Sequence, residues 1–323
     1  MAETVLSVGI DIGTSTTQLV FSSLTIENVA SVAAIPRITV VDKRVVYRSD
    51  IHFTPLLSPT TIDADGVRRI VEQEYARADV DRNAISAGAV IITGETARKE
   101  NAETVLRSLS GLAGNFVVAT AGSDLESILA GKGAGAGSFS RREHMAVANF
   151  DIGGGTTNVV LFRDGDVVDT TCLDIGGRLV KLDPKMRVVQ YVAPGITTLV
   201  ESMGLPIAVG RAASVEDLTR LTDRMAEFFD ELMGLRDRTP LFERMLTAHD
   251  LRAAPEAKGV SFSGGVADCI DSVPEAGLFA YGDIGVLLGQ SVARTRLFRT
   301  LVRVPAEETI DRKSTRLNSS HGS

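Results

Sequence analysis

The amino-acid sequence predicts an α/β fold of two lobes, each built on a mixed sheet with flanking helices. Three observations predict it. A chain of 323 residues is long enough to form two hydrophobic cores. A segment rich in glycine and threonine starts at residue 11 and returns at residue 151. Apolar runs typical of strands alternate with segments of helical period, which is the pattern of layered α/β domains.

The repeated segment is the strongest of these observations. Residues 11–18 read DIGTSTTQ and residues 151–158 read DIGGGTTN, with five of the eight positions identical. Apolar runs stand before and after each copy and predict strands. Each copy therefore predicts a hairpin with a tight turn, and one hairpin opens each half of the chain. The apolar runs are residues 5–10, 19–21, 145–150 and 159–162.

Both predicted turns have the chemistry of a phosphate-binding loop. Glycine lets the backbone come close to a ligand, and consecutive free N–H groups form a nest for an anion. Serine and threonine hydroxyls can add hydrogen bonds to phosphate oxygens. The candidate phosphate-binding residues are Gly13, Thr14, Ser15, Thr16, Gly153, Gly154, Gly155, Thr156 and Thr157.

An aspartate ends the predicted strand before each turn. Neither turn contains a lysine, so a divalent cation has to supply much of the positive charge. Asp11 and Asp151 are the candidate catalytic residues and magnesium ligands, because hydrated Mg²⁺ prefers carboxylate and phosphate oxygens. One Asp-Ile-Gly by itself is also typical of a plain hairpin turn. Two matched copies with threonines at the same offsets favour the phosphate-binding function.

The paired segments resemble the two phosphate loops of the superfamily that contains actin, sugar kinases and the heat-shock chaperone ATPases. Residues 260–268, VSFSGGVAD, resemble the adenosine motif of that superfamily, with Gly264, Gly265 and Asp268 as candidate nucleotide contacts. The resemblance implies an actin-like ATPase fold, related to ribonuclease H. It also implies ATP or ADP with Mg²⁺ in a cleft between the lobes.

Residues 122–131 resemble the first connecting helix of the same superfamily. Its acidic residue commonly lies near the attacking water, which makes Glu126 a candidate catalytic residue. An ordinary solvated glutamate on the helix surface is a nearly equal interpretation, because one carboxylate on a helix is weak evidence for a catalytic role. Lys99 is a candidate for the phosphate-contacting lysine of some chaperone members. The glycines of residues 131–137 follow a helix rather than a strand, so they indicate a helix exit or a packing segment instead of a dinucleotide loop.

The remaining pattern orders the elements of the two lobes. Ser214 begins a capping box, and the residues from Leu218 to Leu232 that follow have the spacing of a helix face. In the first half, two helices and two strands alternate as βαβα layering requires. They are a helix with one face spaced over residues 67–78, a strand at 90–92, a helix at 95–109 and a strand at 116–119.

Three regions follow from this order. Residues 1–145 form the first lobe, with phosphate loop 1 and the connecting helix. Residues 146–310 form the second lobe, with phosphate loop 2 and the adenosine motif, and related proteins continue beyond this point, so this lobe is expected to be shortened. Residues 311–323 are polar and patternless, resemble translated adaptor sequence and are excluded from the fold.

Up to residue 310, the chain resembles the family of ethanolamine ammonia-lyase reactivating factors. The most particular matches are ITGETARK at residues 92–99 and YGDIG at residues 281–285. The resemblance implies a chaperone with slow, magnesium-dependent ATPase activity. Such a chaperone expels damaged cobalamin from adenosylcobalamin-dependent ethanolamine ammonia-lyase, its protein partner, so that intact cofactor can enter. It implies a cytoplasmic protein, and leaves open a homodimer and association with a bacterial microcompartment.

Two other functions stay open from the sequence. One is a small-molecule kinase of the same fold, and the other is an ATP-binding filament or division scaffold. A kinase needs an acceptor-site base, and a division scaffold usually carries an amphipathic membrane-targeting tail. Neither feature is evident in the sequence.

Charge and composition argue against several further classes. The 34 basic and 41 acidic residues give a net charge of -7, which offers no basic footprint for nucleic acid or an anionic membrane. No run approaches the roughly 20 apolar residues that cross a bilayer, and no signal peptide precedes the first strand. Cys172 and Cys269 have no cysteine neighbour, so two reduced, buried thiols are expected.

Overall fold

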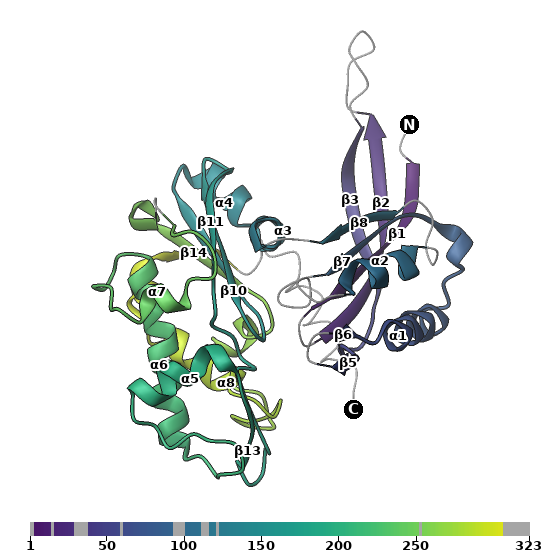
Figure 1. Ribbon diagram of the computed structural model, residues 1–323. Coiled ribbons are helices and arrows are strands. Elements are labelled where there is room, and N and C mark those ends of the chain that lie inside the picture. The colour runs from purple at the N-terminus through teal and green to yellow at the C-terminus, as the bar shows by residue number, and fades with distance from the viewer. Residues whose placement is uncertain are drawn as a thin grey trace. The chain divides into compact units, whose positions relative to one another are not determined.

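The computed structural model describes residues 3–13, 16–28, 38–58, 61–92, 101–110, 116–120, 123–251 and 254–305. The chain divides into two compact units, residues 1–122 (unit 1) and residues 123–323 (unit 2) (Figure 1). Each unit is built on a mixed sheet of its own.

Unit 1 is centred on a sheet with the strand order β3-β2-β1-β7-β8, and β4 pairs with β2. The first three strands form an antiparallel meander, whereas β1, β7 and β8 run parallel. The strands are β1 (Glu3–Ile12), β2 (Thr16–Asn28), β3 (Ile38–Arg48), β4 (His52–Phe53), β5 (Leu56–Ser58), β6 (Thr61–Ile62), β7 (Ile85–Ile92) and β8 (Phe116–Thr120).

Helices cover one face of the unit 1 sheet (Figure 1). Alternate residues of β1, among them Ile10 and Ile12, are buried and pack in one cluster with Val67 and Val71. These contacts confirm the helix face predicted from residue 67, and β7 and β8 confirm the strands predicted near residues 90 and 116. The helices are α1 (Ala64–Arg77), the 3-10 turn η1 (Arg82–Ala84) and α2 (Ala102–Ser110).

A buried carboxylate joins α1 to the meander of unit 1. Glu74 is fully buried, and it accepts hydrogen bonds from the Tyr47 hydroxyl at 2.6 Å and from Arg77 at 2.9 Å. A ring nitrogen of His52 lies 2.9 Å from the same carboxylate. Burial raises the pKa of Glu74, but the hydrogen bonds of Tyr47 and His52 outweigh it and hold the pKa below its ordinary value. The bond to Glu74 also raises the pKa of Tyr47 to about 12, so the phenol stays a donor.

We expect Glu74→Gln to destabilise the chain by about 2 kcal/mol at pH 7, the size of a lost charged hydrogen bond. Because the folded pKa lies below the ordinary value of 4.5, the carboxylate contributes stability above that pH and loses it as pH falls through the folded pKa. The difference in unfolding free energy between wild type and variant should therefore shrink in urea unfolding curves as the pH falls below the ordinary value of 4.5. Glu72→Gln, on the same helix but 38% exposed, is the matched control. A constant difference at all pH values would contradict this account.

Unit 2 repeats the topology of unit 1. Its sheet has the order β11-β10-β9-β14-β15, with an antiparallel meander of the first three strands and parallel pairing of β9, β14 and β15. The predicted repeat is confirmed, because both copies form the first hairpin of a sheet with this order. The strands are β9 (Val147–Ile152), β10 (Thr157–Arg163), β11 (Asp166–Leu173), β12 (Val180–Leu182), β13 (Val189–Val192), β14 (Gly259–Ser263) and β15 (Val302–Arg303).

The predicted long helix of unit 2 begins at a side-chain cap. Ser214 accepts a hydrogen bond from the Asp217 backbone N–H at 3.0 Å and starts the predicted long helix. The helices are α3 (Ser123–Gly133), α4 (Ala136–Glu143), α5 (Pro194–Ser202), α6 (Val215–Leu232), α7 (Phe242–Met245), η3 (Ala254–Glu256), η4 (Ala267–Cys269), α8 (Gly285–Val292) and α9 (Arg296–Thr300).

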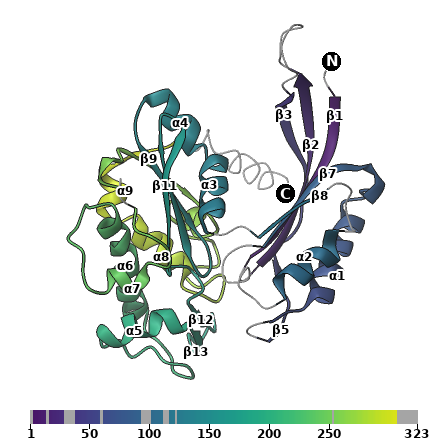
Figure 2. The ribbon, with the colours of Figure 1, turned by 45° about the horizontal axis from the view of Figure 1, so that its top comes forward.

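Alternate residues of β9 face opposite sides of the unit 2 sheet. Phe150 and Ile152 belong to the large core formed with α5, α6 and α8. Val147 packs on the other side with Phe139 of α4, and Figure 2 shows α3 and α4 beside β9 and β11. A Cβ atom on Gly131 would lie 2.4 Å from Val160, so this glycine lets α3 pack closely on β10. The glycine-rich stretch is thus a packing segment, as predicted.

The helices α3 and α4 place the structural division before residue 123 rather than at residue 145. The sequence assigned the connecting helix to the first lobe, but α3 and α4 pack on β9, β10 and β11 and share a hydrophobic cluster with them. The proposed adaptor-like tail at residues 311–323 lies outside the described residues. Among the described helices, none is both long and apolar enough to cross a membrane.

Candidate functional site

The two predicted phosphate loops close in the same way. The Gly13 N–H donates to the Thr16 carbonyl at 2.8 Å, and the Gly153 N–H donates to the Thr156 carbonyl at 2.9 Å. The pairing register sets Asp11 opposite Gln18, just as it sets Asp151 opposite Asn158. Thr14 and Ser15 lie outside the described residues.

Phosphate loop 1, residues 11–17, is supported by the segment that follows β3. The Thr54 hydroxyl donates to the Gly13 carbonyl at 2.8 Å and lies 3.1 Å from the Thr17 hydroxyl. The Ser49 hydroxyl accepts from the Leu19 N–H at 2.9 Å. Sequence reasoning missed these supporting hydroxyls, because nothing in their local pattern connects them with residue 13.

Phosphate loop 2, residues 151–157, lies beside the predicted adenosine motif. The parallel pairing of β14 with β9 sets Ser263 opposite Asp151, and the Ser263 hydroxyl donates to the Asp151 carboxylate at 2.7 Å. Gly264 has a φ of +83°, and a Cβ atom there would lie 2.5 Å from the Ile152 carbonyl oxygen. Only glycine allows this backbone conformation and this close approach. The structure thus brings together the second loop and the paired glycines.

The three candidate nucleotide contacts of the adenosine motif lie at the surface of unit 2. Gly264, Gly265 and Asp268 are exposed, whereas the neighbouring Cys269 is buried. Burial, together with Asp268 and Asp283, raises the pKa of the Cys269 thiol to about 11. Neither Cys172 nor Cys269 forms a disulfide, and both are buried, as predicted.

Residues 176–178 pack against phosphate loop 2 and donate hydrogen bonds to its backbone. Sequence reasoning did not include this segment in the site. The Gly177 N–H donates to the Gly153 carbonyl at 2.9 Å, and the Arg178 N–H donates to the Gly154 carbonyl at 2.7 Å. A Cβ atom on Gly176 would lie 2.4 Å from the Gly154 carbonyl oxygen. A signal was present, because residues 174–176 repeat the Asp-Ile-Gly of both loops.

The helix that carries Glu126 covers the face of the sheet on which Asp151 lies. Asp151 is two residues from Asn149 and four from Val147, so the three share one face of β9. Val147 packs against the α3–α4 layer on that face. Glu126 is half-buried on α3, and its role near an attacking water stays a prediction. Lys99 lies outside the described residues.

The donor set of the loops fits a magnesium-bound phosphate chain. In loop 2, the residues from Gly153 to Thr156 are half-exposed, and their backbone N–H groups and the Thr156 hydroxyl stand near one carboxylate in the sequence, that of Asp151. Mg²⁺ keeps several waters and usually takes only one or two carboxylates in addition to phosphate oxygens. Asp11 in unit 1 and Asp151 in unit 2 are each a candidate ligand of a hydrated ion, which would supply charge neutralisation at the outer phosphates.

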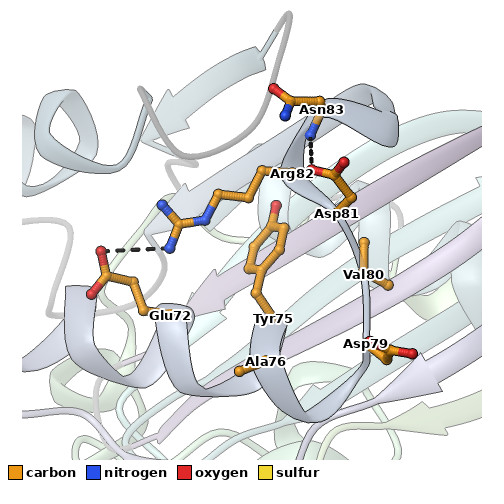
Figure 3. Close-up of a pocket in the computed structure, with 8 residues that line it drawn as sticks. All are labelled: Glu72, Tyr75, Ala76, Asp79, Val80, Asp81, Arg82 and Asn83. Carbon is orange, nitrogen blue, oxygen red and sulfur yellow. Dashed lines mark hydrogen bonds and ion pairs between the residues drawn. The ribbon is translucent and has the colours of Figure 1, made fainter.

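A separate surface hollow of about 620 Å³ lies in unit 1, at the end of α1 (Figure 3). It is close to Ile85, where β7 begins, whereas loop 1 follows the opposite ends of the same parallel strands. The Tyr75 hydroxyl beside it is buried, and burial raises its pKa to about 12. The hollow is therefore separate from phosphate loop 1. Its lining residues are Glu72, Tyr75, Ala76, Asp79, Val80, Asp81, Arg82 and Asn83.

Two sheets of identical strand order, each opened by a glycine-rich hairpin turn, define the class of protein: this is an actin-like ATPase fold. Within that class, the chain belongs to the EutA family. The profile of this family, described as "Ethanolamine utilisation protein EutA", matches residues 3–315.

Two curated proteins are similar to the chain along most of its length. The ethanolamine ammonia-lyase reactivase EutA of Escherichia coli (strain K12) is 37% identical over 303 residues, which are 94% of this chain. The protein of the same name from Salmonella typhimurium (strain LT2) gives the same identity and coverage. The chain spans 64% of the length of each relative. A Ppx/GppA family member from Aquifex aeolicus is 14% identical with a TM-score of 0.48, covering 99% of this chain and 100% of that chain.

Proposed function

We propose that this chain acts as an ATP-dependent reactivating chaperone of adenosylcobalamin-dependent ethanolamine ammonia-lyase. In this role it promotes the exchange of damaged cobalamin for intact cofactor, without carrying cobalamin itself. The observation that carries the proposal is the 37% identity over 303 residues to relatives named as reactivases of that lyase.

The proposed chemistry is slow, magnesium-dependent ATP hydrolysis. Both phosphate loops are proposed to contact the phosphates of ATP or ADP, with Asp11 and Asp151 as ligands of the hydrated ion. Gly264, Gly265 and Asp268 are proposed to contact the nucleoside, and Glu126 to orient the attacking water. Two matched hairpin turns and the close packing of Gly264 against the second loop support these roles.

Nucleotide binding can act on a protein partner only if it favours one conformation of the chaperone over another. Phosphate and magnesium binding supply that differential energy, and hydrolysis followed by phosphate release removes it. The lyase would then meet a different conformation in each nucleotide state. A homodimer and association with a bacterial microcompartment belong to the same proposal.

The deciding experiment mixes this chain with inactivated ethanolamine ammonia-lyase, ATP, Mg²⁺ and free adenosylcobalamin. The Escherichia coli relative serves as positive control, and omission of Mg²⁺ serves as negative control. We expect lyase activity to return only when nucleotide and metal are both present. Magnesium-dependent ATP binding without recovery of lyase activity would contradict the reactivase proposal.

The same samples separate the alternatives. Phosphate transfer to an added sugar or acid would favour a small-molecule kinase. ATP-dependent polymers that sediment, with no recovery of lyase activity, would favour a filament scaffold. The reactivase proposal predicts neither result.

A further inference from the structure

The tripeptide Asp-Ile-Gly occurs four times in the chain, at residues 11–13, 151–153, 174–176 and 283–285. The last three belong to unit 2, where the backbone links them in series. The Gly177 N–H donates to the Gly153 carbonyl at 2.9 Å, and the Ile284 N–H donates to the Gly177 carbonyl at 3.1 Å. A Cβ atom on Gly177 would lie 2.8 Å from the Cα atom of Gly285. Residues 176–178 are therefore held between phosphate loop 2 on one side and residues 283–285 on the other.

The buried carboxylate of Asp283 hydrogen-bonds residues 283–285 to Arg178. Asp283 is 5% exposed, and its two oxygens have different partners. One accepts the Gly285 N–H at 2.8 Å, and the other accepts from Nε of Arg178 at 3.2 Å. The backbone N–H of the same arginine donates to the Gly154 carbonyl of the loop at 2.7 Å. Arg178 thus connects the Asp283 carboxylate with the loop backbone, because its side chain donates to the carboxylate and its backbone N–H donates to the loop.

We propose that Asp283 is a positioning residue for nucleotide phosphate, which acts through Arg178 and the glycines at 176 and 177 to fix the backbone of phosphate loop 2. The inference rests on the proposed nucleotide-binding function. It adds the ion pair of Asp283 and Arg178, two residues that belong neither to the phosphate loops nor to the adenosine motif. A phosphate nest works only when its N–H groups are held in one geometry, so the residues behind the nest control affinity.

The chemistry of the pair supports a positioning role over simple packing. Burial raises the pKa of Asp283 above its ordinary value, and the Gly285 N–H and the Arg178 guanidinium, which lower it, offset only part of this effect. A buried ion pair seldom adds net stability compared with apolar residues of similar size, and fixing one geometry is the better-attested role of such pairs. Here the geometry that is fixed is that of residues 176–178 against the loop.

Asp283→Asn tests the proposal, because the amide has nearly the same shape but cannot accept from both partners as a charged group. We expect the dissociation constant of MgADP, measured by isothermal titration, to rise about tenfold, as for other residues that orient a ligand-binding group. The dissociation constant of adenosine, which has no phosphate, should change by less than about twofold, because loop 2 is proposed to contact the phosphates and not the nucleoside.

Glu231→Gln is the matched control. Glu231 is likewise a buried carboxylate that pairs with an arginine, Arg224 at 2.7 Å, but it lies on α6 and accepts from the Thr239 N–H, away from both phosphate loops. The control should lower the unfolding midpoint as much as Asp283→Asn does, while the MgADP constant stays unchanged. If both variants weaken MgADP in proportion to their loss of stability, Asp283 is only structural and the proposal is wrong.

Arg178 variants complete the test and also serve if Asp283→Asn folds poorly. Arg178→Ala should weaken MgADP about as much as Asp283→Asn, and the double variant should be no weaker than either, because the two residues act in series. Arg178→Lys, which keeps a cation beside Asp283, should retain more affinity than the alanine variant. Additive losses would overturn the proposal. Wild-type protein that fails to bind MgADP would instead refute the nucleotide function, and the positioning role with it.

Discussion

Replacement of Asp151 by alanine is expected to weaken magnesium-dependent ATP binding by about a hundredfold, or roughly 2.7 kcal/mol. The residue ends β9 immediately before the glycines of loop 2, and Ser263 donates to its carboxylate at 2.7 Å. Removing the carboxylate takes away a proposed ligand of the hydrated ion, and no lysine stands in either turn to replace the lost interaction. Asp11→Ala should have a similar effect, because its hairpin closes with the same hydrogen bond.

The measurement is isothermal titration of ATP with and without Mg²⁺, with one nucleotide per chain as the expected stoichiometry. Asp151→Asn keeps the shape and the partner at Ser263, so a similar loss in this variant would assign the effect to charge. Asp166→Ala is the control, since this residue lies in the same unit with a side chain that is 91% exposed. If Asp151→Ala lost no affinity, or lost the same affinity without Mg²⁺, the carboxylate would not be a metal ligand.

Gly176→Ala is the second substitution with a large expected effect. A Cβ atom there would lie 2.4 Å from the Gly154 carbonyl oxygen and 2.7 Å from the Gly155 carbonyl carbon, both of which are backbone atoms of the phosphate loop. To reach an ordinary contact distance the loop has to move by about 1 Å, and a misplacement of that size can cost about a hundredfold in a binding or catalytic site. We therefore expect ATP hydrolysis and MgADP affinity to fall by about that factor, with a stability loss of about 1–3 kcal/mol.

Gly133→Ala provides the control for this substitution. Gly133 ends α3, and a Cβ atom there would meet nothing within 4 Å. Alanine favours a helix over glycine by up to about 1 kcal/mol, so this variant should be as stable as wild type or slightly more stable, with unchanged nucleotide affinity. Full activity of Gly176→Ala in a folded protein would show that the segment behind the loop does not control it.

The local pattern of the sequence was sufficient for the hairpins and for most helices. The repeat at residues 11 and 151 predicted two equivalent hairpins because glycine, threonine and alternating apolar residues act over a few neighbours. The capping box at Ser214 predicted the start of α6 for the same reason, since the hydroxyl and its donor are three residues apart. The role of Glu126, the nucleotide contacts and the metal ligands stay predictions.

The contacts between these local elements and residues far away in the chain are seen only in the tertiary structure. No local pattern indicates that residue 54 contacts Gly13, that residue 263 contacts Asp151 or that residue 283 contacts residue 178. Strand pairing brings these positions together although they are far apart in the chain. The tertiary structure also decided that α3 and α4 belong to unit 2, since their apolar and glycine faces fit β10. By itself the sequence determined the two loops and the family, because both depend on residue identity. The support behind each loop depends on long-range contacts, which only the folded chain contains.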